Sequence, residues 1–396
     1  MDREPRTHQP VRTAQHGGIN NTRGQTMDVP AEAPGADAPL RVAVVGCGYW
    51  GPNLIRNFAA LPQATLVAAC DLSQERLQAI GAQYPDIRLT TSYAELLNSD
   101  VDAIAIATPV RSHYPLVKQA LQAGKHVLVE KPLTGNVADG MEVVELAERN
   151  GLILMVDHTF LFEPAVEALR DLVQSGELGD IWQVSAARLN LGLIRPDANV
   201  VWDLAPHDIS ILLEVLGADP LTVSARGVAH VQPGIPEVAY LELGFPKNVM
   251  AHVNVSWLEP SKVRRITIVG SRKMAVYNDT LPDKLRVFDR SVVATETDEG
   301  SRELSYRFGE TTSVSLPKLE PLRRQAAHFV ACIRQGETPR VDGRQGLRVV
   351  QILELADRSL HNGGHRETVD ADATRVSKIS PFPRRDQRPG PIAAAR

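Results

Sequence analysis

The sequence predicts an α/β protein in which a doubly wound domain on a parallel sheet precedes an α+β domain on a large, open, mostly antiparallel sheet. The first part of this prediction rests on short apolar runs that alternate with helical segments between residues 39 and 160, since strands covered on both faces need no polar alternation. The second rests on strands between residues 161 and 370 in which apolar and polar residues alternate. The length of 396 residues also exceeds what one ordinary core contains.

In the first domain, strands and helices are expected to follow one another in turn. Five strands are predicted, at residues 41–45, 65–69, 103–107, 126–129 and 152–156. Ser92 and Glu95 have the spacing of a capping box and predict the start of a helix. Gly124 and Gly151 stand where two other helices are expected to end.

The second domain is expected to contain helices at residues 164–175, 201–216, 322–334 and 346–359, and strands at 181–189, 221–231, 238–243, 249–257, 264–269 and 273–277. In the strand at 249–257, Met250 and Trp257 lie on opposite faces. This two-sided strand indicates a sheet face that is available for association. We therefore expect a homodimer or a homotetramer.

The two ends of the chain differ in composition from the rest. Residues 1–38 are rich in Gly, Pro, Gln, Asn and Arg, and residues 371–396 are rich in Pro and Arg, so both are expected to be disordered tails. The first segment lacks the apolar core of a secretory signal, and part of it is also consistent with an over-extended translation start.

Composition argues against several classes of protein. The net charge of -4 gives no electrostatic footprint for nucleic acid. No apolar run approaches the roughly 20 residues that span a bilayer, so no membrane partner is expected. The three cysteines, Cys47, Cys70 and Cys332, are odd in number and none are spaced as C-x-x-C, which argues against a disulfide framework and a zinc site. We expect no metal and a reducing, cytoplasmic location.

A glycine motif follows the first predicted strand and opens a helix. It reads Gly46-x-Gly48-x-x-Gly51, with Cys47, Tyr49 and Trp50 at the x positions. In a dinucleotide site, one glycine makes the tight turn, one lets the backbone approach the pyrophosphate, and one lets helix and strand pack closely. The pyrophosphate then lies at the helix N-terminus. We expect these six residues to bind a dinucleotide, with Cys47 as a small packing residue and Trp50, like Trp202, in the wall or the core.

An acidic residue strengthens this interpretation. Asp71 lies 20 residues after Gly51, at the end of the next predicted strand, which is the usual place of a ribose-binding carboxylate. The alternative is an ordinary turn with a helix-capping aspartate. A carboxylate accepts a hydrogen bond from the ribose 2′-OH but repels a 2′-phosphate, and no arginine follows immediately. The expected cofactor is therefore NAD, with NADP the less favoured choice.

Further motifs resemble those of the glucose–fructose oxidoreductase / inositol dehydrogenase / MocA (Gfo/Idh/MocA) family. The resemblance is carried by Glu130-Lys131-Pro132 at a strand end, by Thr108-Pro109 with His113, and by Asp203-x-x-x-His207, and it covers roughly residues 40–365. It implies a Rossmann domain, an open-sheet domain that often makes oligomer contacts, and NAD(P)-dependent oxidation or reduction of a sugar or cyclitol carbinol. Residues 199–208 are similar to the branch that acts on nucleotide-linked sugars, including UDP-N-acetylglucosamine 3-dehydrogenases.

Three residues are candidates for catalysis. Lys131 follows a parallel strand at its carboxyl end, where ligands bind in such sheets, and its ammonium could stabilise the substrate oxygen. Asp203 and His207 are four residues apart in a predicted helix and share a face. His207 could act as the base, and Asp203 could orient it or bind a second hydroxyl. The alternatives are a surface lysine, a helix-terminal acid and a histidine on a backbone carbonyl. The sequence leaves open whether Lys131 or His207 accepts the proton.

The remaining candidates line the expected clefts. The resemblance places Thr108, Pro109, His113 and Glu130 in the cofactor pocket, although His113 is also consistent with a helix start. His158, just past a strand, could face the cleft or fill the domain junction. A substrate phosphate could be bound by side chains before the second motif, namely Arg188, Asn190 and Arg195, although exposed arginines are more often only solvated.

Four other functions fit the sequence. The first is a deoxysugar ketoreductase and the second an inositol or free-sugar dehydrogenase. The third is an oxidoreductase that never releases its cofactor. The fourth, from another class, is a non-catalytic NAD-binding sensor, against which the presence of Lys131, Asp203 and His207 argues.

Overall fold

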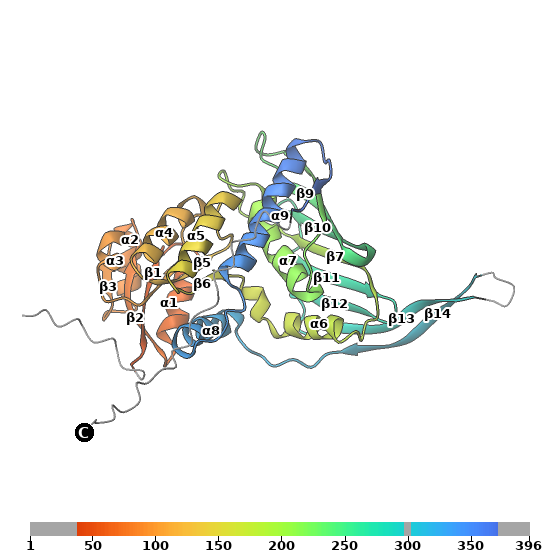
Figure 1. Ribbon diagram of the computed structural model, residues 1–396, viewed down its shortest axis with the longest axis horizontal. Helices are drawn as coiled ribbons and strands as arrows, with labels where there is room; N and C mark the ends of the chain where they lie inside the picture. The colour runs from red at the N-terminus through yellow and green to blue at the C-terminus, as the bar shows by residue number, and fades with distance from the viewer. Residues whose placement is uncertain (1–37, 297–301, 371–396) are drawn as a thin grey trace, which may run out of the picture. The chain divides into compact units, whose positions relative to one another are not determined.

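The structure, a computed structural model, describes residues 38–296 and 302–370 (Figure 1). The tails expected at residues 1–38 and 371–396 lie outside these residues, apart from Ala38. No helix within the described ranges is long and apolar enough to cross a membrane.

Six strands of the described chain form a parallel sheet in the order β3-β2-β1-β4-β5-β6. This confirms the predicted doubly wound domain, because the order is that of the dinucleotide-binding fold. The order in which the chain adds strands reverses between the neighbours β1 and β4. The side chains of these two strands are buried almost throughout. The strands are β1 (Leu40–Val45), β2 (Ala64–Cys70), β3 (Arg88–Thr90), β4 (Ala103–Ile106), β5 (His126–Glu130) and β6 (Leu154–Asp157). The sequence did not predict β3, since it has only three residues, two of them exposed.

Helices connect these strands, and the helix ends that the sequence predicts at Ser92, Gly124 and Gly151 are observed. Ser92 accepts a hydrogen bond from the Glu95 amide at 3.4 Å and caps α3. The capping box is only half formed, because the Glu95 carboxylate accepts from the Thr90 hydroxyl instead, at 2.6 Å. Gly124 and Gly151 have positive φ angles after α4 and α5. These elements are α1 (Gly51–Ala59), α2 (Gln74–Gly81), α3 (Tyr93–Leu97), η1 (Val110–Ser112), α4 (His113–Gln122) and α5 (Val137–Arg149).

The second domain is built on a sheet of nine strands, counted over the described residues, in the order β14-β13-β12-β11-β7-β10-β9-β8-β15. Neighbouring strands are antiparallel except for β7 and β10, as predicted for a mostly antiparallel sheet. The strands are β7 (Ile181–Leu189), β8 (Thr222–Val228), β9 (Val238–Phe245), β10 (Val249–Ser256), β11 (Val263–Gly270), β12 (Met274–Asn278), β13 (Leu285–Glu296), β14 (Arg302–Ser313) and β15 (Glu367–Thr368).

One face of this sheet is covered by α6, α7 and α9 (Figure 1). On β10, Val249, Ala251, Val253 and Val255 are buried on the covered side, whereas Met250 on the other side is 48 % exposed. The helical elements are η2 (Thr159–Phe162), α6 (Pro164–Gln174), α7 (Val200–Leu216), η3 (Pro246–Asn248), α8 (Pro321–Gln335) and α9 (Gly343–His361). The last two helices, α8 and α9, also contact the first domain: α8 packs on α1 and α9 packs on α5.

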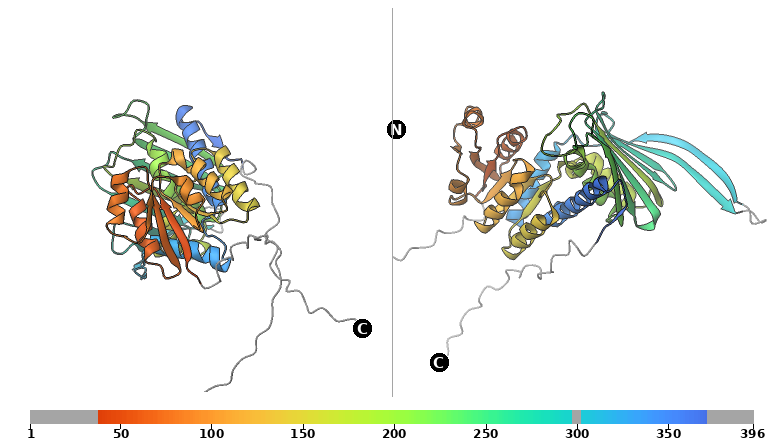
Figure 2. Two further views of the ribbon diagram at one scale, coloured as in Figure 1. Left: turned by 90° about the vertical axis from the view of Figure 1, so that its left-hand side faces the viewer. Right: turned by 90° about the horizontal axis from the view of Figure 1, so that it is seen from above.

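The β13–β14 hairpin was not predicted. Its strands have twelve residues each and pair with one another, and Figure 2 shows the hairpin continuing beyond the rest of the sheet. Every residue of β14 is exposed. Burial therefore imposes no constraint on its sequence, and charged residues interrupt the apolar ones.

Candidate active site

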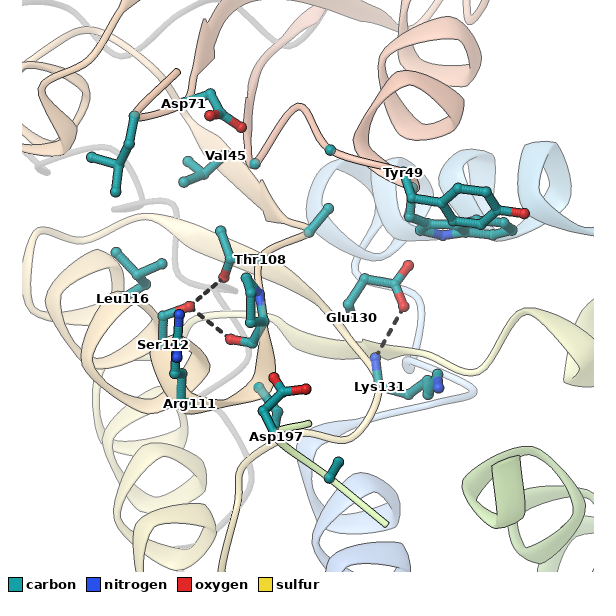
Figure 3. A pocket seen from close by; sticks show the side chains of 18 of the residues that line it. Val45, Tyr49, Asp71, Thr108, Arg111, Ser112, Leu116, Glu130, Lys131 and Asp197 are labelled. Carbon is teal, nitrogen blue, oxygen red and sulfur yellow. Dashed lines mark hydrogen bonds between the residues drawn. The ribbon is translucent and has the colours of Figure 1, made fainter. Parts of the chain in front are cut away.

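A cavity of about 690 Å³ opens at the carboxyl ends of the first sheet's strands, beside the point where the strand order reverses. Ligands bind at this place in open parallel sheets, and the volume suits a small-molecule site. Figure 3 shows Asp71 at one end and Glu130 with Lys131 at the other. The lining includes Gly46, Gly48, Tyr49, Trp50, Asp71, Arg76, Thr108, Pro109, Arg111, Glu130, Lys131, Arg195, Trp202 and Asp203.

The glycine loop has the geometry that its sequence predicts. Gly46 has a φ of +93°, and a Cβ there would lie 2.6 Å from the Ala107 carbonyl oxygen. A Cβ on Gly51 would lie 1.8 Å from the Gly46 carbonyl oxygen, so this glycine lets α1 begin directly against the loop. The N-cap residue of α1, Trp50, gives no side-chain hydrogen bond to the first turn. Within that turn Pro52 has no N–H and the Asn53 amide donates to the Trp50 carbonyl oxygen at 2.9 Å. The Gly51 amide and the positive end of the helix dipole are therefore what this helix end offers to a dinucleotide pyrophosphate.

The x positions of the loop differ in their surroundings. Cys47 is buried and lies outside the cavity lining, with its thiol 3.9 Å from the Cys70 carbonyl. Burial raises the pKa of this thiol to about 12, so Cys47 contributes packing and a backbone amide. Tyr49 is 93 % exposed at the rim. Trp50 lines the cavity and donates from its indole Nε1 to the Asp157 carboxylate at 3.1 Å.

Asp71 is fixed in the cavity wall by backbone amides. Its Oδ2 accepts from the Cys47 amide at 2.6 Å, and its Oδ1 accepts from the Ser73 amide at 2.8 Å. Arg76, on the first turn of α2, places a guanidinium nitrogen 3.7 Å from Oδ2. Arg76 was not predicted as a site residue, although its position five residues after Asp71 puts it at the start of the helix that faces the ribose end.

His113 does not line the cavity. Its side chain is buried, and its two ring nitrogens lie 2.8 Å from the carbonyl oxygens of Thr108 and Pro132. His113 therefore ties together the two loops after β4 and β5. Thr108 and Pro109 do line the cavity.

Lys131, which follows β5 of the first domain, contacts Asp203 on α7 of the second domain at the cavity. Its Nζ donates to the Asp203 carbonyl oxygen at 2.7 Å and lies 3.8 Å from the Asp203 carboxylate. The carboxylate also accepts from Trp257 Nε1 at 3.0 Å and pairs with Arg195 at 3.2 Å. Burial lowers the pKa of Lys131, and the nearby carboxylate of Asp203 partly offsets this effect.

His207 lies one turn beyond Asp203 on α7 and outside the cavity lining. Its ring packs edge-on against Phe160 with centroids 5.1 Å apart. Its Nδ1 is buried without a hydrogen-bond partner among the described residues. Burial, and then the positive charges of Lys131 and Arg188, hold the pKa of His207 well below its ordinary value. At neutral pH the imidazole is therefore unprotonated, and the same effects make it a weaker base than a free imidazole.

Two predicted substrate contacts lie elsewhere. Arg188 is only 4 % exposed and forms a two-bond pair with Asp208, at 2.8 and 3.1 Å, while its guanidinium lies over the Phe160 ring. Neither Arg188 nor Asn190 lines the cavity, whereas Arg195 does. The expectation that Arg188 and Asn190 contact a substrate phosphate is therefore not supported by this cavity, whereas that for Arg195 stays a prediction. His158 is buried at the domain junction, and neither ring nitrogen has a partner within the described chain.

Comparison with known proteins assigns the chain to a family. Residues 40–158 match the model of an oxidoreductase family with an NAD-binding Rossmann fold. Residues 166–276 match the GFO/IDH/MocA C-terminal domain. The chain belongs to the Gfo/Idh/MocA oxidoreductase family. Its cofactor is accordingly a nicotinamide dinucleotide of the NAD type, and its chemistry is that of a dehydrogenase.

Individual relatives of this oxidoreductase include enzymes that act on sugars. UDP-N-acetylglucosamine 3-dehydrogenase from Acidithiobacillus ferrooxidans is 28 % identical over 78 % of this chain and 94 % of its own length. Its solved structure has a TM-score of 0.70, at 26 % identity over 82 % of this chain and 98 % of that one. D-apiose dehydrogenase from Paraburkholderia graminis is 27 % identical over 85 % of this chain and 92 % of its own.

A further solved structure supports the family at higher identity. It is a putative oxidoreductase from Magnetospirillum magnetotacticum, which is 31 % identical over 81 % of this chain and all of that chain, with a TM-score of 0.69.

Proposed function

We propose that this oxidoreductase oxidises a secondary carbinol of a nucleotide-linked sugar, with C3 of a UDP-N-acetylglucosamine-type substrate as the reacting carbon. The observation that carries the proposal is the placement of the Lys131 ammonium, held by Asp203, at the inner end of a cavity whose other end is Asp71. The name of the Acidithiobacillus relative, which matches over most of both chains, supports the choice of substrate.

Lys131 is proposed to stabilise the substrate oxygen as it gains negative charge. A bound NAD supplies the hydride acceptor at this end of the cavity. Because Asp203 neutralises only part of the Lys131 charge at 3.8 Å, the ammonium can still donate to a hydroxyl. The Asp203 carboxylate contacts Lys131, Arg195 and Trp257, so we assign it to positioning Lys131 instead of orienting His207.

His207 is proposed to accept the hydroxyl proton. A base must be unprotonated when substrate binds, and the lowered pKa of His207 meets this requirement at neutral pH. Its location on α7, the helix that also presents Asp203 to Lys131, supports a shared substrate. The proton moves from the carbinol oxygen to an imidazole nitrogen, while Lys131 keeps its own.

Arginines at the cavity support a phosphorylated substrate. Arg195 lines the cavity with its side chain 47 % exposed, and Arg111 is another arginine of the lining. Guanidinium groups bind phosphate oxygens through two parallel hydrogen bonds. We propose that Arg195 contacts the diphosphate.

The test is NADH formation with a panel of nucleotide sugars, sugar phosphates, free sugars and inositols. The proposal expects the highest kcat/KM with a UDP-linked N-acetylhexosamine, and loss of that preference in Arg195→Ala. Activity on inositols or free sugars only would refute the nucleotide-sugar assignment. Turnover only in the reverse direction, with keto sugars and NADH, would identify a ketoreductase. Binding of NAD without turnover of any member would favour a sensor.

We also propose that the uncovered face of the second sheet pairs with a second copy of the chain. Tyr240 on β9 and Met250 on β10 are 58 % and 48 % exposed on this face. Sedimentation velocity should show a dimer or tetramer that Tyr240→Glu with Met250→Lys shifts toward monomer. A monomer in the unmodified protein would refute this assembly.

A further inference from the structure

Two carboxyl side chains end neighbouring strands beside the cavity. Glu130 is the last residue of β5 and Asp157 the last of β6, and they are paired in register. Asp157 is 2 % exposed. Its oxygens accept hydrogen bonds from Trp50 Nε1, at 3.1 Å, and from the Thr159 hydroxyl. Both oxygens of Asp157 therefore have hydrogen-bond donors.

Glu130 lacks comparable donors. Its Oε2 accepts from the Lys131 amide at 3.3 Å, and its Oε1 is buried without a partner among the described residues. The side chain lines the cavity next to Lys131 (Figure 3). Ionising a buried carboxyl group without a partner costs free energy. The free Oε1 could therefore be stabilised by a positive charge that a bound ligand brings.

Ionising both Glu130 and Asp157 at once is energetically unfavourable, because their negative charges would repel each other. Carboxylates that share a buried site ionise one at a time. Since Asp157 has the donors, Glu130 keeps the proton: burial, followed by the charge of Asp157, raises the pKa of Glu130 well above its ordinary value. Lys131 opposes this effect, but its ammonium also faces Asp203 at 3.8 Å.

The two redox states of the cofactor differ in charge at this end of the cavity. With its adenosine ribose at Asp71, the dinucleotide is expected to extend past the glycine loop toward Glu130 and Lys131. The oxidised nicotinamide ring carries a positive charge that the reduced ring lacks. A nearby positive charge favours the ionised form of a carboxyl group.

We propose that Glu130 distinguishes oxidised from reduced cofactor by releasing its proton when NAD⁺ binds and keeping it when NADH binds. The neutral acid plus NAD⁺ becomes a carboxylate beside the positive ring, and one proton leaves to solvent. With NADH no ionisation occurs. The inference depends on NAD binding alone and holds for any substrate, so failure of the sugar assignment leaves it untouched.

Proton release is measured by titration calorimetry on the full chain, in two buffers that differ in ionisation enthalpy. At pH values below the raised pKa of Glu130 in the free protein and above its pKa with NAD⁺ bound, the unmodified protein should release up to one proton per NAD⁺ bound and none per NADH. Its affinity for NAD⁺ should weaken by up to about tenfold for each unit of falling pH over the same range, while its affinity for NADH stays constant.

Two variants separate Glu130 from its neighbours. Glu130→Gln cannot ionise, so NAD⁺ binding should release no proton and become independent of pH. Asp157→Asn removes the neighbouring charge but not the burial, so the pH range over which NAD⁺ binding releases a proton should move downward, although NAD⁺ still binds. Persistent release in Glu130→Gln would assign the proton to another group, such as Lys131, and overturn the proposal. Equal release with NADH, or no release from the unmodified protein, would also overturn it.

Discussion

The buried pair of Arg188 and Asp208 makes the sharpest stability prediction. Arg188→Ala leaves the Asp208 carboxylate, which is 1 % exposed, without its two hydrogen bonds. Breaking one side of a buried pair costs about 3–5 kcal/mol, because the remaining charge is uncompensated. Arg195→Ala is the matched control. It breaks an ion pair whose arginine is 47 % exposed, and this should cost about 1 kcal/mol or less.

The assay is urea unfolding of both variants, followed by circular dichroism. Arg188→Ala should lower the free energy of unfolding far more than Arg195→Ala. The double replacement Arg188→Met with Asp208→Leu should regain most of the loss, since no buried charge remains. Equal stability of the two single variants, together with a raised substrate KM only in Arg188→Ala, would refute the structural role assigned to Arg188.

Three further outcomes are expected. kcat/KM should fall at low pH as His207 gains a proton, with a pKa below 6.5. It should also fall at high pH as Lys131 loses a proton, with a pKa below 10.5. A loss of kcat/KM at low pH with a pKa above 6.5 would contradict the lowered pKa of His207. Asp71→Ser should shift the kcat/KM ratio toward NADP by about 10²-fold or more, because it removes a carboxylate and leaves an arginine 3.7 Å from that site; an unchanged ratio would speak against Asp71 as the selecting residue. Gly51→Ala should weaken NAD binding, measured by fluorescence titration, by at least about tenfold. Gly135→Ala should leave NAD binding unchanged, because an added Cβ there would have no atom within 4 Å. Equal NAD affinities of the two variants would contradict the close approach at Gly51.

The sequence predicted the residues whose positions depend on local pattern. Asp71 and Lys131 were found because strand ends in a parallel sheet share one edge. The same rule applies to Asp157, which ends β6, but its indole partner Trp50 lies 107 residues away in the sequence. No local pattern indicates that contact.

The sequence could not determine which charged side chains are free. Arg188 and Arg195 look alike in the sequence, yet Arg188 is paired with Asp208 from α7 while Arg195 reaches the cavity. Likewise, His113 follows a motif that the resemblance assigns to the cofactor, but the tertiary fold directs its ring to two backbone carbonyls. Partners on distant elements decide these roles.

The proposed chemistry depends on Lys131 and His207 acting on the substrate and not on cofactor binding. The decisive measurement compares kcat and the NAD dissociation constant for Lys131→Met, His207→Ala and the surface control Lys118→Met, with the substrate identified by the panel. Each active-site variant should lower kcat by about 10²-fold or more, while NAD affinity stays within about threefold of that of the unmodified protein; the control should match the unmodified protein. Turnover near that of the unmodified protein in either Lys131→Met or His207→Ala would contradict the role proposed for that residue.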